Sequence, residues 1–225
     1  VLATVRKEGV PELTDRASMR EARDLENTAL GAPYGPILQY VEVITKSGIT
    51  KKLPIAHPFA LLWASVDASP MLKALLADRI LAHPTSPESP WHLVLYSDEV
   101  TPGNALSPMN RRKFQAVYFS FLELGASALS NEESWWCVQV EFSTVINDLS
   151  AMMSQMFAKI FKLLFNPEGL HLSTSGVTLP VNADGVRLFA VLGAFLQDGG
   201  AHKVTWHCRG DGASKLCMLC KNIFT

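Results

Sequence analysis

Two aspartates stand at the ends of apolar segments that lie a hundred residues apart in the chain. Asp98 follows the apolar run 92–96, and Asp198 follows the longer run 186–196. Enzymes that cut or transfer phosphodiesters commonly hold two divalent ions about 4 Å apart, between carboxylates carried by a sheet. Mg²⁺ prefers such hard oxygen ligands, and Mn²⁺ is a common substitute. If both runs are strands, the pair predicts a metal site for phosphoryl transfer.

Each aspartate also has a purely structural interpretation. Asp98 can begin a turn, because Thr101, Pro102 and Gly103 follow it closely, and Asp198 can cap a helix. Spacing alone favours this interpretation. Glu99 is a further carboxylate beside Asp98, but successive strand residues point to opposite faces. Glu99 therefore joins Asp98 only if the strand has already ended.

A second candidate site is a pair of cysteines near the C-terminus. Cys217 and Cys220 have the C-x2-C spacing at which two thiolates bind one zinc ion from a tight turn. His207 and Cys208 are the nearby candidates for the remaining ligands. The alternative is two ordinary buried cysteines, and it stays open.

Basic residues follow the first aspartate and surround the cysteine pair. Arg111, Arg112 and Lys113 form the one dense basic run, and Lys215 and Lys221 lie beside the cysteines. These five side chains are candidates for contacts with nucleic-acid phosphates. A solvated turn before a strand is the commoner explanation of such a run.

Composition bounds the class of protein. Of 225 residues, 48% are hydrophobic and 18% are charged, which is typical of a globular protein. The net charge of −1 gives no electrostatic argument for a nucleic-acid or membrane partner. No apolar run reaches the roughly 18 residues that a membrane-spanning helix needs, so we expect no membrane partner.

The cysteine pattern favours a reducing, intracellular compartment. The chain starts with Val1 and stops soon after Cys220, which suggests a piece of a longer protein.

Residues 1–88 are expected to form a small α+β region of unknown role, which ends in the Pro/Ser-rich stretch 83–90. The patterns predict a helix over 16–29, a strand hairpin over 40–44 and 49–55, and helices over 58–68 and 71–81.

Residues 89–225 have a different pattern. Strands are predicted over 92–96, 113–124 and 135–146, and a strong helix with an apolar methionine-bearing face over 150–165. Residues 170–172 and 177–181 are expected to form a hairpin, 186–196 is ambiguous between strand and helix, and 201–206 is a predicted helix. Trp135 and Trp136 can stack on bases, but paired tryptophans in an apolar segment are more often core residues.

The sequence segments around both aspartates resemble those of a known protein family. The stretch HLVLYSDEVTPGNALSPMNRRKFQAVYFSFLELG is similar to a segment of transposase-like proteins of the Kyakuja–Dileera–Zisupton type and related eukaryotic mobile elements. The stretch RLFAVLGAFLQDGGAHKVTWHCRGDGASKLCMLCKN looks like the matching downstream segment. The resemblance spans roughly residues 91–222 and leaves 1–90 uncovered. Asp211 interrupts a stretch that is glycine-rich in the family.

This resemblance implies an α/β, ribonuclease-H-like mixed sheet with flanking helices, incomplete at its C-terminus, with a cysteine-pair zinc element over 207–222. It matches Asp98 to the first acid of a D-D-E site, on the first strand, and Asp198 to the second, after the fourth. The third acid then lies beyond residue 225, so we expect this piece to be inactive by itself.

The implied function is that of a nuclease and strand transferase for DNA recombination, with Mg²⁺ or Mn²⁺, DNA as partner, a nuclear location and a homo-oligomer as an option. The alternative is a non-enzymatic, zinc-stabilised binding module, such as a domesticated remnant of a mobile element.

Overall fold

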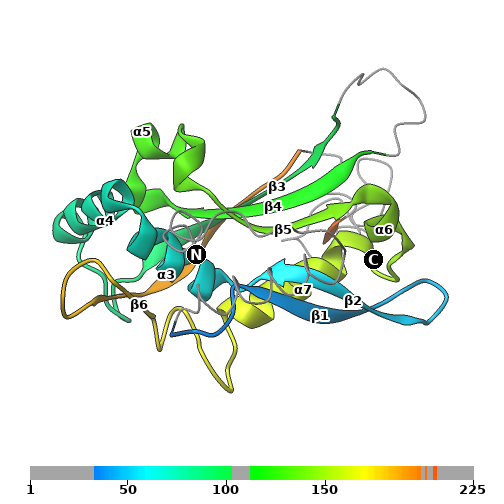
Figure 1. The fold of residues 1–225 in the computed structure, drawn as a ribbon, viewed down its shortest axis with the longest axis horizontal. Helices are drawn as coiled ribbons and strands as arrows, with labels where there is room; N and C mark the ends of the chain where they lie inside the picture. Colours follow the sequence, from blue (N-terminus) through cyan, green and yellow to red (C-terminus); the bar gives the residue numbers. More distant parts are fainter. Residues whose placement is uncertain (1–32, 103–111, 199–200, 202–204, 207–225) are drawn as a thin grey trace, which may run out of the picture.

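The computed structural model describes residues 33–102, 112–198, 201, 205 and 206. Within them the fold is mixed α/β, with a four-stranded mixed sheet flanked by helices (Figure 1), as the sequence predicted. The predicted helix over 16–29 and the zinc element over 207–222 lie outside the described residues.

The N-terminal part begins with the predicted hairpin. Strand β1 (Leu38–Ile44) pairs antiparallel with β2 (Thr50–Ala56). Gly48 in the connecting turn has φ +80°, a left-handed conformation that glycine adopts without strain.

Two helices follow the hairpin, as their apolar spacing predicted. These are α3 (Pro58–Ala68) and α4 (Pro70–Ala82), and each begins with a proline, which lacks the backbone N–H that the first turn leaves unbonded. The side chain of His57 caps α3, and that of Ser69 caps α4.

The central sheet has the strand order β5-β4-β3-β8. Strands β3 (Trp91–Val100), β4 (Phe114–Phe121) and β5 (Trp136–Phe142) form an antiparallel meander, and β8 (Ala190–Leu196) lies parallel to β3 on its other side. The run 186–196, ambiguous in the sequence, is therefore strand throughout most of its length.

One face of this sheet carries the core. Helix α7 (Met152–Leu164) packs there, with Met153, Met156 and Ile160 buried, which confirms the predicted helix and its apolar, methionine-bearing face. Phe157 of α7 contacts Phe195 of β8 edge-on, at 4.7 Å between ring centroids. Because strand residues alternate, the side chains at 93, 95, 97 and 99 of β3 share this α7 face, and those at 94, 96 and 98 share the opposite face.

Several local predictions are wrong in detail. Strand β5 stops at Phe142, and the end of the predicted strand 135–146 is instead the short helix α6 (Ser143–Asp148). Residues 177–181 do not pair with 170–172; β6 (Val177–Leu179) pairs with β7 (Val186–Leu188). Strand β4 ends in a 3-10 turn, η1 (Leu122–Leu124), before α5 (Ala126–Leu129) and η2 (Glu132–Ser134).

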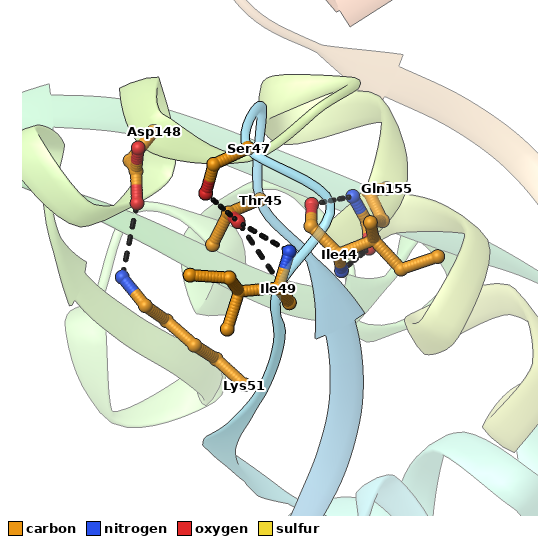
Figure 2. A network of polar contacts seen from close by, with 7 residues as sticks. All are labelled: Ile44, Thr45, Ser47, Ile49, Lys51, Asp148 and Gln155. Carbon is orange, nitrogen blue, oxygen red and sulfur yellow. Dashed lines mark hydrogen bonds and ion pairs between the residues drawn. The ribbon is translucent and has the colours of Figure 1, made fainter.

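The β1–β2 hairpin is fastened to the helical layer at the junction of α6 and α7 (Figure 2). The side-chain amide of Gln155 donates to the carbonyl of Ile44 at 3.0 Å, and its oxygen accepts from the Ile44 N–H at 2.5 Å. Lys51 forms an ion pair with Asp148 at 2.9 Å. These contacts join a segment before residue 88 to segments after it.

The buried hydrophobic residues form one cluster that also crosses residue 88. Val43, Ile55 and Phe59 belong to it together with Leu93 and Phe119 of the sheet. Among the described helices, none alone is both long and apolar enough to cross a membrane; α3 and α4, bent by 108° at their junction, satisfy length and composition only when counted together.

Candidate functional site

The pairing of β3 with β8 determines where the two aspartates lie. Leu95 pairs with Phe195 and Tyr96 with Leu196, in parallel register. Two residues beyond the last pair, the chain reaches Asp98 on one strand and Asp198 after the other. Side chains at the carboxyl ends of neighbouring parallel strands meet at one edge of a sheet, where open α/β sheets place their ligands. Asp98 and Asp198 therefore share one edge.

Asp98 lies inside β3, which continues to Val100, so the expected end of the strand at Tyr96 is wrong and Asp98 does not begin a turn. Its side chain is half-buried on the face opposite α7, where it shares a row with Ala116 of β4. The hydroxyl of Tyr96, two residues earlier on the same face, donates to Asp98 Oδ2 at 2.9 Å.

Both aspartates affect the pKa of Tyr96. Burial raises the pKa of Tyr96, and the hydrogen bond to Asp98 raises it further, because the neutral phenol is the form that donates. The negative charges of Asp98 and, more weakly, of Asp198 add to this pKa rise. Both carboxylates thus act electrostatically on one hydroxyl.

Asp198 is exposed just beyond β8, and its Oδ1 accepts a hydrogen bond from the N–H of Ala201 at 2.5 Å. That is the geometry of a helix cap, and Ala201, Thr205 and Trp206 are helical. Asp198 therefore has the helix-capping role that was considered for it. The capping hydrogen bond uses one of its two carboxylate oxygens.

Glu99 lies on the opposite face from Asp98, because β3 has not ended at this position. Its carboxylate accepts hydrogen bonds from Lys113 at 2.8 Å, Ser143 at 2.8 Å and Gln115 at 3.2 Å. Burial acts to raise the pKa of Glu99, but the bonds from Lys113, Ser143 and Gln115 and the charge of Lys113 outweigh it and lower the pKa. Glu99 is therefore a neutralised, structural carboxylate.

A cavity of about 290 Å³ opens on the α7 side of this sheet edge. Its polar lining includes Glu99, Gln197 and Asp198, while Asp98 is not one of the described residues that line it. The cavity therefore brings Asp198 together with Glu99, and Asp98 approaches the same edge from the other face.

Gln197, which lines this cavity, connects the ends of β3 and β8. Its Nε2 donates to Ser97 Oγ at 2.6 Å and to Thr205 Oγ1 at 3.0 Å. The Ser154 hydroxyl of α7 in turn donates to the carbonyl of Thr205. This network holds β3, β8 and the segment after Asp198 together, so the position of Asp198 depends on residues from three elements.

The predicted basic contacts divide into three groups. Lys113 pairs with Glu99 on the α7 face at 2.8 Å. Arg112 is exposed. Arg111, Lys215 and Lys221 lie outside the described residues, as do the zinc candidates His207, Cys208, Cys217 and Cys220. In the part of the chain that the structure describes, no group of three or more His, Cys, Asp or Glu side chains is placed to hold a metal ion.

The two tryptophans differ in environment. Trp136 is 4% exposed and stacks on Phe119 at 5.3 Å, which confirms the core role favoured by the sequence. Trp135 is only half-buried, and its Nε1 donates to the carbonyl of Leu129 at 3.0 Å. Its ring lies edge-on to Tyr96. Trp135 therefore belongs to the surroundings of Asp98.

Sequence reasoning missed Tyr96 and Gln197. The signal for Tyr96 was available, since a donor two residues before an aspartate in a strand lies on the same face. Gln197 had no such signal, because its partner Ser97 belongs to a distant strand and no local pattern links Gln197 to Thr205. Comparisons of the chain with protein-family models, with curated proteins and with solved structures found no match.

Proposed function

We propose that this chain is part of a D-D-E transposase-like nuclease and strand transferase that acts on DNA phosphodiesters, with Asp98 and Asp198 as ligands of Mg²⁺ or Mn²⁺. The observation that supports the proposal is the parallel pairing of β3 and β8, which brings both aspartates to one sheet edge. In chain order β3 is the first strand of the sheet and β8 the fourth. These are the positions that the family resemblance assigns to the first and second acids of a ribonuclease-H-like core.

The oxygens available at this edge suit a hard divalent cation. Tyr96 occupies Oδ2 of Asp98, and the Ala201 N–H occupies Oδ1 of Asp198. Among the described residues, the other oxygen of each carboxylate has no hydrogen-bond partner, so each aspartate can give one oxygen. Mg²⁺ keeps several waters and is often held by only one or two carboxylates.

The proposed roles of the two aspartates and of the divalent ions follow from these positions. Asp98 is held by a rigid strand and Asp198 by a helix cap, so both ligands are oriented before any cation arrives. Divalent ions at such a site supply the activation of a water or a 3′-hydroxyl and the stabilisation of charge on the reacting phosphate. The family resemblance implies a third acid outside residues 1–225, so under this proposal DNA cleavage requires a protein that includes it. DNA as the partner, a nuclear location and a homo-oligomeric state are parts of the same proposal.

The test is Asp98→Ala in a longer protein that includes the continuation, with Glu99→Gln as the matched control. Asp98→Ala is expected to abolish Mn²⁺-dependent DNA cleavage with little change in thermal stability, while Glu99→Gln retains cleavage. Cleavage by Asp98→Ala at the wild-type rate would remove Asp98 from the site.

A second candidate is a non-enzymatic binding module stabilised by zinc at the cysteine pair. One observation favours it: Asp198 already caps a helix and lines its cavity with Glu99, not with Asp98. Under this alternative the chain binds no Mn²⁺ at Asp98, and removal of zinc by a chelator lowers its melting temperature. Mn²⁺ titration of the wild type and of Asp98→Asn separates the two candidates.

A further inference from the structure

Among the described residues, the Tyr96 hydroxyl donates the one hydrogen bond that the Asp98 carboxylate accepts. Both side chains are half-buried on the same face of β3, and the Tyr96 hydroxyl donates to Asp98 Oδ2 at 2.9 Å. A hydrogen bond to an ionised group is stronger than one between neutral groups. The bond therefore restricts the rotation of the carboxylate and leaves Oδ1 as the oxygen without a partner among the described residues.

The Tyr96 ring is held independently of Asp98. It stacks on Tyr118 of β4 with ring centroids 6.2 Å apart and planes inclined by 24°. On another side, Trp135 meets it edge-on at 6.0 Å. Trp135 is itself fixed by the hydrogen bond from its Nε1 to the carbonyl of Leu129, at 3.0 Å. Packing thus sets the position of the hydroxyl, and the hydroxyl sets that of the carboxylate.

Among the described residues, the Asp98 face of β3 offers little else to orient this side chain. Its neighbours in the same row are Ala116 of β4 and, across β4, Val140 of β5, neither of which has a polar side chain. Without the hydroxyl, Asp98 would choose among several staggered rotamers. The orientation needed to share a cation with Asp198 would then be only one of them.

We propose that Tyr96 is a positioning residue that holds Asp98 in the orientation in which its free oxygen binds a divalent cation together with Asp198. This inference rests on the proposed function, because it assigns a role at the same site. Partners that orient metal ligands in this way typically contribute about 10-fold or more to metal affinity. They do so without touching the metal.

The experiment compares Tyr96→Phe with Tyr118→Phe, each made in the full 225-residue chain. Each variant loses one hydroxyl from the same aromatic pair and keeps its ring, but only Tyr96 donates to Asp98. The Mn²⁺ dissociation constant is measured from the electron paramagnetic resonance signal of free Mn²⁺, and thermal melting reports on folding. Tyr96→Phe is expected to weaken Mn²⁺ binding by about 10-fold, with Tyr118→Phe unchanged and both melting like the wild type.

Each outcome has a definite meaning. Equal Mn²⁺ affinity of Tyr96→Phe and wild type, where Asp98→Asn abolishes binding, overturns the positioning role but leaves the metal site intact. Equal binding by wild type and Asp98→Asn overturns the proposed metal site itself. If Tyr118→Phe weakens binding as much as Tyr96→Phe, the effect belongs to the ring pair and not to the hydroxyl, and the proposal fails.

Discussion

The two faces of the sheet near the end of β3 treat adjacent carboxylates in opposite ways. On the α7 face, Glu99 accepts hydrogen bonds from an ammonium, a hydroxyl and an amide. On the other face, Asp98 accepts one hydrogen bond from a tyrosine hydroxyl, and it forms no ion pair with the other described residues. Among the described residues, Lys113 compensates the negative charge of Glu99, and no such partner lies at Asp98.

This difference shows how a strand assigns structure and chemistry to successive residues. Alternation sends neighbouring side chains to opposite faces, so two acids of similar chemistry meet entirely different partners. A carboxylate that is surrounded by donors has little to gain from a cation. A carboxylate that lies near a second acid and keeps an oxygen without a donor gains more from a cation, since like charges in proximity favour cation binding or protonation.

The largest effect is expected at Gly193 of β8, where the backbone passes close to His92 of β3. A Cβ atom added at Gly193 would lie 2.5 Å from the Cβ and 3.2 Å from the Cα of His92, so the strands must move apart. Gly193→Ala should therefore destabilise the fold by about 1–3 kcal/mol, measured by urea unfolding, and weaken Mn²⁺ binding by displacing Asp198 from Asp98.

Gly169→Ala is the control for that substitution. Its added Cβ would meet only the flexible Asn166 side chain, at 2.8 Å, so its cost should be small. An equal loss of stability in both variants would mean that close strand approach at Gly193 is unimportant.

Exchanging the two acids for alanine should separate stability from cation binding. Glu99→Ala removes the acceptor of three hydrogen bonds and is expected to cost about 1 kcal/mol, since this half-exposed site is partly screened by water. Asp98→Ala should cost less stability but eliminate Mn²⁺ binding, which Glu99→Ala retains. Chemical denaturation and Mn²⁺ titration of both variants check this. Loss of Mn²⁺ binding in Glu99→Ala alone would reverse the assignment of the two faces.

The contribution of Glu99 should also depend on pH. The folded-state pKa of Glu99 lies below its ordinary value of 4.5, so the folded state binds the proton less readily than the unfolded state. The stabilisation is therefore fully present above pH 4.5 and is lost as pH falls through the lowered pKa. Unfolding of wild type and Glu99→Gln, followed from neutral to acidic pH, should show a stability gap that closes in this window. A gap that widens on acidification would contradict the direction of the pKa shift.

Lys113→Met should have the smallest effect. The Lys113 side chain is 39% exposed in its ion pair with Glu99, and such surface pairs contribute about 0–1 kcal/mol. Ser143 and Gln115 still bond Glu99 in this variant. The small loss should disappear in about 1 M salt, where charges are screened over roughly 3 Å. A loss that persists there would contradict the assignment of the effect to the Lys113–Glu99 ion pair.

The sequence by itself determined the local elements of this protein. Apolar spacing predicted α3, α4 and α7, and the strand patterns over 40–44 and 49–55 predicted the β1–β2 hairpin, because these signals act between residues close in the chain. The apolar runs before Asp98 and Asp198 also identified the two places where a sheet edge could carry acids.

Only the tertiary structure decided how those elements combine. The parallel pairing of β3 with β8 joins segments that lie far apart in the chain. The sequence patterns also missed the helix at Ser143 and the pairing of β6 with β7. The folded chain also decided the separation of Asp98 from Glu99, since strand alternation has meaning only once β3 is known to reach Val100. Hydrogen bonds between distant segments leave no periodic trace in either segment, and for that reason the neighbours of an acidic side chain follow from the folded chain alone.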